Sequence, residues 1–370
     1  MRVVLYINSL DTGGAERTLV KLANFMAGLS WEVTIVTQQP PELDRFELDA
    51  AVQRHSTETG HLSDSFSAAL FNNARRIYRL RRFVKTYQPN VVIAFMATAN
   101  TVATFATRGT GIPVIVSERN YPPALELSIP HRLAQRIANH RAEKMVVLTE
   151  DTKRWYQEER GLTRLTVIPN GVTYPIPAST PRLTPDSFIN PATRLLLCVG
   201  RITQQKQPEV AIGAFASVAK DHPEWHMIWV GRGDTERLQA LAEQHGIRHR
   251  FSTTGAVGNV QDWYERADAY LLTSAYEGFP NTLLEALACG CASIALDCPT
   301  GPAEIIETGK NGLLVDLNNS NALTEALHRI MGDPSLRSKL SQAASDVRQT
   351  FSDQASHTAW RSLVEETAHL

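Results

Sequence analysis

Short apolar runs recur along the 370-residue chain, and each leads through a polar or glycine-containing turn into a segment with helical periodicity. The runs are rich in valine, isoleucine and leucine, which is typical of strands buried on both faces of a sheet. They cover residues 3–7, 33–37, 91–95, 113–116, 145–148 and 166–172 in the first half, and 195–199, 226–230, 251–255, 269–273, 293–295 and 312–315 in the second. Alternating strands and helices predict an α/β fold with parallel, doubly wound sheets.

A proline-rich segment separates the two series of strands. Five prolines and no periodic pattern occupy the stretch from Tyr174 to Pro191. A chain of this length suggests two domains of about 150 residues each. The expected division is an N-terminal domain over residues 1–173, a linker over 174–192, a C-terminal domain over 193–352, and a last helix, 353–370, that packs back on the first domain.

Composition excludes several classes of partner. The formal net charge of −1 provides no global basic field for nucleic acid. Four cysteines without a Cys-x-x-Cys spacing indicate reduced thiols in a cytoplasmic protein. No apolar run approaches the roughly 20 residues that a membrane-spanning helix needs, and the first strand is too short for a signal peptide. Any membrane contact is therefore expected to be peripheral.

The stretch 276–286, Tyr-Glu-Gly-Phe-Pro-Asn-Thr-Leu-Leu-Glu-Ala, joins the strand 269–273 to a predicted helix. Gly278 and Pro280 keep the turn open and bring backbone N–H groups to its surface. Glu277 lies before the helix and Glu285 about one turn inside it. Glutamate pairs at this spacing are common on surface helices. Between a strand and a helix N-terminus, however, they predict a pocket for a polyhydroxyl, anionic ligand.

Two further turns have the composition of phosphate-binding loops. Arg201 and Lys206 flank a strand-to-helix turn, from which two cations can clamp a diphosphate, although ordinary charges in an exposed loop would look the same. Gly13 and Gly14 lie between the first strand and the first helix, where a ligand can approach the backbone; a simple tight turn is the alternative.

The predicted helix over residues 64–88 has two different faces. Leu70, Ile77, Leu80 and Val84 share one side and are expected to pack on the domain. The opposite side carries the three arginines Arg75, Arg79 and Arg82, flanked by Phe71, Tyr78 and Lys85. No acidic residue lies between Asn72 and Gln88, so these cations lack partners one turn away. The face suits anionic lipid or a diphosphate, unless it is merely solvated.

Polar residues also follow the strand 113–116, where Glu118, Arg119 and Asn120 come after Ser117. Ligands of α/β proteins bind at the carboxyl ends of parallel strands. We therefore expect these three residues to contribute to a binding site.

Together these motifs resemble family 4 of the retaining glycosyltransferases, which have the GT-B fold. The resemblance covers almost the whole chain through GGAER (13–17), IPNGV (168–172), GRITQQK (200–206), VGRGD (230–234), EGFPNTLLEALACG (277–290) and TGPAEII (300–306). The first half is similar to bacterial N-acetylhexosaminyltransferases that extend undecaprenyl-diphosphate-linked glycans, including α-1,4-N-acetylgalactosaminyltransferases, through GGAERTLVKLANFM (13–26), IAFMATAN (93–100) and VIVSERN (114–120). The resemblance implies two Rossmann-like domains facing a central cleft.

The resemblance also implies roles for individual residues in the second half. Glu277 would lie beside the donor sugar as a catalytic residue, with Arg201 and Lys206 binding the diphosphate. Glu285 would accept hydrogen bonds from the donor ribose. The donor-binding set is completed by Gly278, Phe279, Pro280, Asn281 and Thr282 and by the loop of Gly13 and Gly14.

The remaining implied roles concern the acceptor. The helix with Arg75, Arg79 and Arg82 would engage a lipid-linked diphosphate. Arg119 stands where many relatives carry histidine, between Glu118 and Asn120 in the expected acceptor site. The expected partners are a UDP-sugar donor, a polyprenyl-diphosphate-linked saccharide and, by peripheral contact, the anionic inner face of the plasma membrane.

The implied chemistry is departure of a nucleotide diphosphate from an anomeric carbon, with fixed cations stabilising the developing charge. No Asp-x-Asp sequence occurs, so neither a metal clamp nor a cofactor is expected. Three alternatives remain: a transferase with a soluble acceptor, a UDP-sugar epimerase of the same fold, and a non-enzymatic protein that binds nucleotide sugars.

Overall fold

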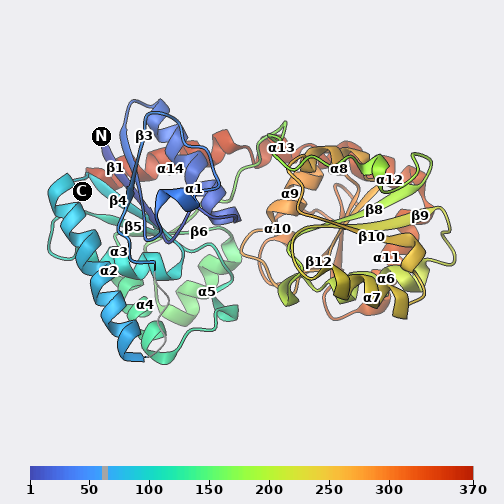
Figure 1. Ribbon diagram of the computed structural model, residues 1–370, viewed down its shortest axis with the longest axis horizontal. Helices are drawn as coiled ribbons and strands as arrows, with labels where there is room; N and C mark the ends of the chain where they lie inside the picture. The colour runs from blue at the N-terminus through green and yellow to red at the C-terminus, as the bar shows by residue number, and fades with distance from the viewer. Residues whose placement is uncertain (61–65, 370) are drawn as a thin grey trace. The chain divides into compact units, whose positions relative to one another are not determined.

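The computed structural model describes residues 1–60 and 66–369 and divides the chain into two compact units (Figure 1). Unit 1 consists of Met1–Asn170 with Gln354–Leu370, and unit 2 of Gly171–Asp353. Each unit contains one parallel sheet covered by helices on both faces, which confirms the predicted fold class.

The sheet of unit 1 has seven parallel strands in the order β3-β2-β1-β4-β5-β6-β7. They are β1 Arg2–Ile7, β2 Glu32–Thr37, β3 Val52–Ser56, β4 Val91–Phe95, β5 Val114–Ser117, β6 Lys144–Val147 and β7 Leu165–Val167. The helices are α1 Gly14–Gly28, α2 Phe66–Tyr87, α3 Ala97–Thr107, α4 Ile129–Arg141, α5 Glu150–Arg160 and α14 Asp353–Ala368, with short 3-10 helices at Pro41–Leu43 (η1) and Pro122–Ala124 (η2).

Alternate residues of each strand supply the two cores of unit 1. Val3 and Leu5 of β1 pack on the face covered by α1 and α14, where Trp360 is buried. Val4 and Tyr6 pack on the opposite face, with α2, α3 and α5 (Figure 1). Both faces of the central strands are apolar, which explains why those strands read as nearly continuous apolar runs, whereas the edge strand β3 has only its first residue buried.

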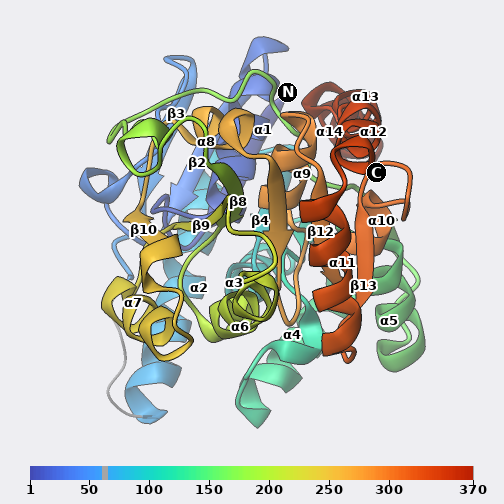
Figure 2. The ribbon, with the colours of Figure 1, turned by 90° about the vertical axis from the view of Figure 1, so that its right-hand side faces the viewer.

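The sheet of unit 2 has six parallel strands in the order β10-β9-β8-β11-β12-β13. They are β8 Arg194–Val199, β9 Trp225–Val230, β10 Phe251–Gly255, β11 Ala269–Leu272, β12 Ser293–Asp297 and β13 Leu313–Asp316. The helices are α6 Pro208–Val218, α7 Thr235–Gln244, α8 Val260–Arg266, α9 Asn281–Ala288, α10 Pro302–Ile305, α11 Ser320–Gly332, α12 Pro334–Ala344 and α13 Val347–Thr350, with 3-10 helices at Pro185–Ser187 (η3), Gln204–Lys206 (η4) and Arg248–Arg250 (η5). Figure 2 shows α6, α7 and α11 on one face of this sheet and α8, α9 and α12 on the other.

The segment before β8 contacts α8 within unit 2. The carbonyl oxygen of Leu183 accepts hydrogen bonds from Asn259 Nδ2 at 2.9 Å and Trp263 Nε1 at 3.1 Å. Ile189 is buried. Part of the proline-rich segment is therefore attached to the surface of unit 2.

One predicted contact of α2 is wrong. Leu80 and Val84 are fully buried and Ile77 packs against the same core, but Leu70 is 66% exposed. The helix has 22 residues, whereas the neighbouring α3 has 11, so α2 is too long for α3 to cover all of it. Residues 64 and 65, the expected start of this helix, lie outside the described residues.

Candidate active site

The strand order of unit 2 creates a switch point between β8 and β11. Connections leave β8 and β11 in opposite directions along the sheet, and ligands of open α/β sheets bind beside such a pair of strands at their carboxyl ends. The turn carrying Arg201 and Lys206 follows β8, and the turn carrying Glu277 follows β11. The sheet topology therefore brings these three predicted residues to one edge.

Backbone and side-chain hydrogen bonds join the two turns. Ala275 N donates to the Gln205 carbonyl at 2.8 Å, and Gln205 Nε2 donates to the Tyr276 carbonyl at 2.9 Å. Thr273 Oγ1 donates to the Lys206 carbonyl at 3.0 Å. These contacts fix the backbone from which both charged side chains project.

Lys206 and Glu277 form a largely buried ion pair. Lys206 Nζ lies 2.5 Å from Glu277 Oε1, and the side chains of the two residues are 15% and 7% exposed. Ser274 Oγ donates to the same carboxylate oxygen at 2.6 Å. Glu277 N donates to Pro299 O at 3.2 Å, and its carbonyl accepts from Thr300 Oγ1. Glu277 is thus held through both its carboxylate and its backbone.

Arg201 differs from Lys206 in its surroundings. It is exposed, and no residue in the described part of the chain forms an ion pair with it. Nearby, Trp229 Nε1 donates to the Gly200 carbonyl at 2.8 Å, and Ile202 N donates to Arg232 O at 2.7 Å. The backbone on either side of Arg201 is therefore anchored while its guanidinium is accessible to an anion.

Close backbone contact explains one glycine beside this turn. A Cβ atom on Gly231 would lie only 1.9 Å from the carbonyl oxygen of Gly200, so any larger residue would push the two loops apart.

Glu285 lies inside α9 and is held by a buried tyrosine. Its side chain accepts a hydrogen bond from Tyr264 OH at 3.2 Å, and Glu285 itself is 7% exposed. Burial, reinforced by the charge of Glu285, raises the pKa of Tyr264 well above its usual value. Tyr264 therefore keeps its proton and remains a hydrogen-bond donor to Glu285.

Two side chains at the turn into α9 contact other parts of unit 2. Phe279 is 5% exposed and packs against Phe351, with ring centroids 5.8 Å apart. Thr282 Oγ1 accepts from Tyr270 OH at 2.9 Å. Gly278, Pro280 and Asn281 complete the turn, and α9 begins at Asn281. The side chains of Phe279 and Thr282 contact other protein groups, so these two residues would meet a ligand through their backbone N–H groups.

In unit 1, Gly13 caps the N-terminus of α1 and Gly14 is the first residue of that helix, after the carboxyl end of β1. A Cβ atom on Gly13 would lie 2.1 Å from the Glu16 carboxylate. The close approach at Gly13 is therefore made by a side chain of the same helix. A ligand role for this loop stays a prediction.

Glu118 and Arg119 form a buried polar network after β5. Glu118 is 1% exposed and accepts hydrogen bonds from the backbone N–H groups of Arg119 at 3.0 Å and Asn120 at 3.2 Å and from Tyr156 OH at 3.2 Å. Burial raises its pKa. These bonds favour a structural role for Glu118 over direct contact with an acceptor.

The Arg119 side chain is buried beside that network. Its guanidinium lies 4.7 Å from the ring centre of Phe95 and donates to Asn170 Oδ1. Burial lowers the pKa of Arg119 to about 9. Arg119 thus joins β5 to the end of β4 and to the last residue of the N-terminal segment of unit 1.

Of the three predicted arginines of α2, Arg79 and Arg82 are exposed and Arg75 is partly buried. None forms an ion pair with an acidic residue in the described parts of the chain. Phe71 and Tyr78, beside them, are 70% and 63% exposed. The face is basic and apolar at once.

Two functional candidates escaped sequence reasoning. Ser274, which contacts Glu277, precedes it by three residues and falls between the predicted strand 269–273 and the stretch 276–286 that the sequence singled out. Tyr264 reaches Glu285 from α8, 21 residues earlier, and no sequence signal marks it. Among the described residues, no helix is long and apolar enough to cross a membrane, and no cluster of histidine, cysteine or carboxylate side chains could hold a metal ion.

Two family models match the chain in succession. Residues 13–171 match the glycosyl transferase 4-like domain, and residues 180–347 match the glycosyl transferases group 1 domain.

An α-1,4-N-acetyl-D-galactosaminyltransferase of Campylobacter jejuni, named for a GalNAc-containing undecaprenol-diphosphate substrate, is 27% identical over 99% of both chains. An exopolysaccharide phosphotransferase of Streptomyces coelicolor is 35% identical over 60% of this chain, and the aligned part spans only 23% of that relative's length.

Solved structures show the same architecture. Sucrose-phosphate synthase from Thermosynechococcus elongatus has a TM-score of 0.85 at 18% identity, covering 99% of this chain and 98% of that one. Anabaena HepE in complex with UDP has a TM-score of 0.80 at 16% identity, covering 99% of this chain and all of that one. The fold is therefore the GT-B fold of paired Rossmann-like domains. With both family domains present, the chain belongs to the group 1 glycosyltransferases.

Proposed function

We propose that this protein is a retaining transferase that moves a hexose or N-acetylhexosamine from a UDP-sugar to a polyprenyl-diphosphate-linked saccharide in bacterial glycan assembly. The observation that carries the proposal is the buried Lys206–Glu277 pair at the β8/β11 switch point, next to the N-terminus of α9. This arrangement holds a fixed cation where a diphosphate would bind in an open α/β sheet.

In the proposed mechanism, Lys206 and Arg201 stabilise the negative charge that develops on the departing diphosphate. Each charge-assisted hydrogen bond is worth about 1.5–3 kcal/mol. Lys206 is held in position by Glu277, so little reorganisation is needed during the reaction. Arg201 is exposed and would close on the phosphate when the donor binds.

The two glutamates would hold the donor sugars. Glu285, oriented by Tyr264, would accept hydrogen bonds from the ribose hydroxyls. Glu277 would position Lys206 and the transferred sugar. A UDP donor is supported by the UDP complex of Anabaena HepE, whose fold this chain shares.

The acceptor proposal is supported by the Campylobacter relative and by α2. That relative is named for an undecaprenol-diphosphate substrate. On α2, the exposed Phe71 and Tyr78 accompany Arg79 and Arg82, a combination suited to an anionic lipid surface. These observations support our proposal that the protein acts at the cytoplasmic face of the plasma membrane, in peripheral contact with it.

A panel of UDP-sugars offered with a defined polyprenyl-diphosphate-linked saccharide tests the function. Mass and linkage of the product should show one sugar type added with the anomeric configuration of the donor. Conversion of the UDP-sugar without acceptor would instead identify an epimerase. Transfer to free sugars but not to the lipid-linked saccharide would reject the acceptor assignment, and an inverted linkage would reject retention.

A further inference from the structure

An open pocket lies in unit 1 between α4 and the second half of α5. It has a volume of about 270 Å³, and its lining combines three arginines with apolar side chains from α4, from the segment before α4 and from the end of α5. The arginines are Arg132 and Arg136 of α4 and Arg160 of α5. Figure 1 shows the two helices beside each other in the lower part of unit 1.

On α4 the lining residues form two parallel strips. Ile129 and Leu133 lie about one turn apart, and so do Arg132 and Arg136. At about 100° per residue the two pairs occupy adjacent strips of one helix face, which extends about 10 Å from residue 129 to residue 136. Ile129 is 73% exposed, Leu133 is 58% exposed, and both arginines are exposed. An apolar strip and a cationic strip are therefore accessible to a ligand side by side.

The wall formed by α5 repeats this combination. The guanidinium carbon of Arg160 lies 4.9 Å from the ring centre of Trp155, and both side chains line the pocket and are half-buried. A cation and an apolar surface thus lie together on this side of the pocket too.

The charged residues of the lining have one sign. No acidic residue of the described chain lines the pocket. Arg132, Arg136 and Arg160 form no ion pair with an acidic residue in the parts of the chain that the structure describes. Glu126 is exposed and outside the lining. Three guanidinium groups without carboxylate partners favour an anion, and their planar N–H groups match phosphate oxygens in pairs.

The pocket borders the buried polar network that follows β5. Gln135 and Tyr156, two further lining residues, both donate to Oε2 of Glu118, at 3.5 and 3.2 Å. These hydrogen bonds connect the wall of the pocket to the carboxyl end of β5, the end of a parallel strand at which ligands of α/β proteins bind. The pocket therefore lies next to the residues from which the sequence predicted an acceptor site.

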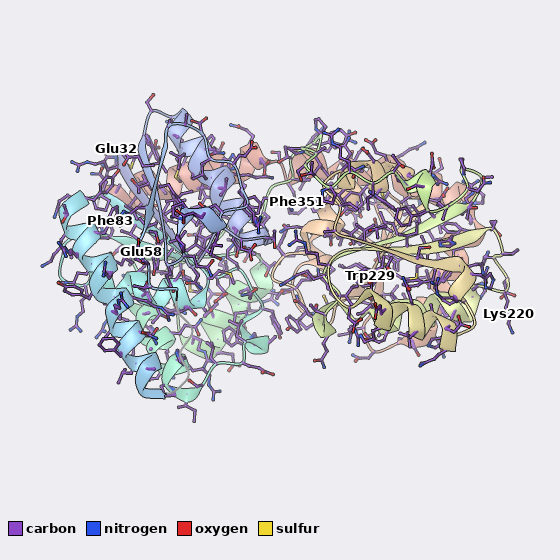
Figure 3. All side chains as sticks on the ribbon, viewed as in Figure 1. Glu32, Glu58, Phe83, Lys220, Trp229 and Phe351 are labelled. Carbon is purple, nitrogen blue, oxygen red and sulfur yellow. The ribbon has the colours of Figure 1, made fainter. Side chains whose placement is uncertain are left out.

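The pocket is separate from the arginines of α2. The helix α3 packs against both α2 and α4. Figure 3 shows Phe83, which belongs to α2, at the left-hand margin of unit 1 and away from α5. Figure 2, turned by 90°, also shows α2 and α5 on opposite sides of this unit. An anion in the pocket would therefore not be bound by Arg79 or Arg82.

We propose that this pocket binds the diphosphate of the polyprenyl-diphosphate acceptor together with the first part of its isoprenoid chain, an inference that rests on the proposed function. Arg132, Arg136 and Arg160 would bind the phosphates, and the chain would cover Ile129 and Leu133. A free nucleotide or sugar phosphate would leave the apolar strip in water, and a neutral lipid would leave the arginines without an anion. The helix α2 would then contact the surrounding bilayer.

Farnesyl diphosphate, a short prenyl diphosphate, tests the proposal without sugar transfer. Its binding to the full-length protein is measured by equilibrium dialysis, with saturating UDP present to fill the proposed donor site. Inorganic diphosphate and farnesol are measured separately. We expect one molecule of farnesyl diphosphate per chain, bound more tightly than either of its parts by about tenfold or more, because each part contacts a different strip.

The location of the bound molecule is read from Trp155. The chain has six tryptophans, so labelling with 5-fluorotryptophan gives six ¹⁹F resonances, and Trp155→Phe identifies the one from Trp155. This resonance should shift and saturate as farnesyl diphosphate is added.

Matched variants separate a built site from general attraction. Arg132→Gln and Arg136→Gln should each weaken binding of farnesyl diphosphate by about tenfold. Arg141→Gln removes the same charge from the same helix at an exposed position outside the lining, so binding should change less than about twofold. Leu133→Gln should weaken binding of farnesyl diphosphate but not of inorganic diphosphate, whereas Leu43→Gln, at another exposed leucine, should affect neither. Thermal unfolding checks that each variant is folded.

A Trp155 resonance that farnesyl diphosphate leaves unchanged would overturn the proposal, as would equal loss of binding in Arg141→Gln. Loss of binding in Arg79→Gln but not in Arg136→Gln would assign the diphosphate to α2 instead. Release of Arg136→Gln from anionic vesicles, without any binding of farnesyl diphosphate to the wild type, would show that this surface contacts the bilayer and not a single prenyl chain.

The outcome is distinguishable from that of the proposed function because binding is measured without a sugar donor. Transfer to the lipid-linked saccharide without binding at this pocket would reject the pocket alone. Binding at the pocket without transfer would reject the proposed function alone.

Discussion

Replacing Lys206 by methionine separates the contribution of the Lys206–Glu277 pair to stability from its contribution to catalysis. Breaking a buried ion pair by removing one partner costs about 3–5 kcal/mol. The Lys206 side chain is 15% exposed, and in the variant Ser274 would still donate a hydrogen bond to Glu277. The lower value, about 3 kcal/mol, therefore applies. At about 2–4 °C per kcal/mol for a domain of this size, Tm should fall by about 6–12 °C.

The double variant Lys206→Met with Glu277→Gln supplies the control. This variant removes both charges, so no buried carboxylate is left without a cation. Most of the stability lost in Lys206→Met should therefore return. Activity should not return, because the cation that faces the leaving diphosphate is still absent. Loss of a single fixed electrostatic contact at a reacting centre typically costs about 10²–10³ in kcat. Thermal unfolding followed by circular dichroism and UDP release in the presence of acceptor measure the two effects.

Two results would refute this reasoning. Turnover in Lys206→Met within about tenfold of the wild-type rate would show that Lys206 does not stabilise the leaving group. Recovery of turnover together with Tm in the double variant would show that the pair acts only through stability.

Glu285→Ala should reduce turnover about 10²-fold. Tyr264→Phe removes only the 3.2 Å hydrogen bond to Glu285, so its main effect should be to raise the KM for the UDP-sugar by about tenfold. An unchanged KM in Tyr264→Phe would contradict a positioning role. Replacing Arg79 and Arg82 by glutamine should release the protein from vesicles of anionic lipid at a lower salt concentration than the wild type, as measured by co-sedimentation. An unchanged salt concentration for half-release would exclude α2 from the membrane contact. Burial raises the pKa of Glu118, so its contribution to stability is present in full below the unfolded-state pKa and is lost as pH rises through the folded-state pKa. In Glu118→Gln, the decline of Tm with rising pH above pH ~4 should therefore be shallower than in the wild type. Parallel curves of Tm against pH for the two proteins would disprove this.

Most strands were predictable because they are buried on both faces. The edge strand β3 was not predicted, because only Val52 of its five residues is buried and the others are polar. An apolar run with no polar alternation, followed by a turn and a helix, specifies a parallel strand almost by itself, and β1, β4, β8, β9 and β11 all follow this rule. How far along α2 the buried face extends was not predictable. Leu70 has the helical phase of Leu80 and Val84, but whether a neighbouring helix reaches it depends on the length of α3, a separate part of the chain.

The partners within the site were also beyond local reasoning. The sequence grouped Arg201 with Lys206 and Glu277 with Glu285, because each pair lies within one motif. In the structure Lys206 contacts Glu277, 71 residues away, and Glu285 contacts Tyr264. The Lys206–Glu277 contact follows from the order of β8 and β11 in the sheet, and the Tyr264–Glu285 contact from the packing of α8 on α9. Sequence spacing encodes neither arrangement.

The contacts of Glu277 also bear on the type of mechanism. Lys206 Nζ and Ser274 Oγ both donate to Oε1 of its carboxylate, at 2.5 and 2.6 Å. Two such donors, one of them charged, stabilise the anion and lower the nucleophilicity of that oxygen. A residue that forms a covalent glycosyl intermediate needs a carboxylate free to attack the anomeric carbon. Glu277 is instead suited to hold Lys206 beside the leaving diphosphate. For the retaining transfer proposed above, attack on the face from which the diphosphate departs is therefore the mechanism that this arrangement favours.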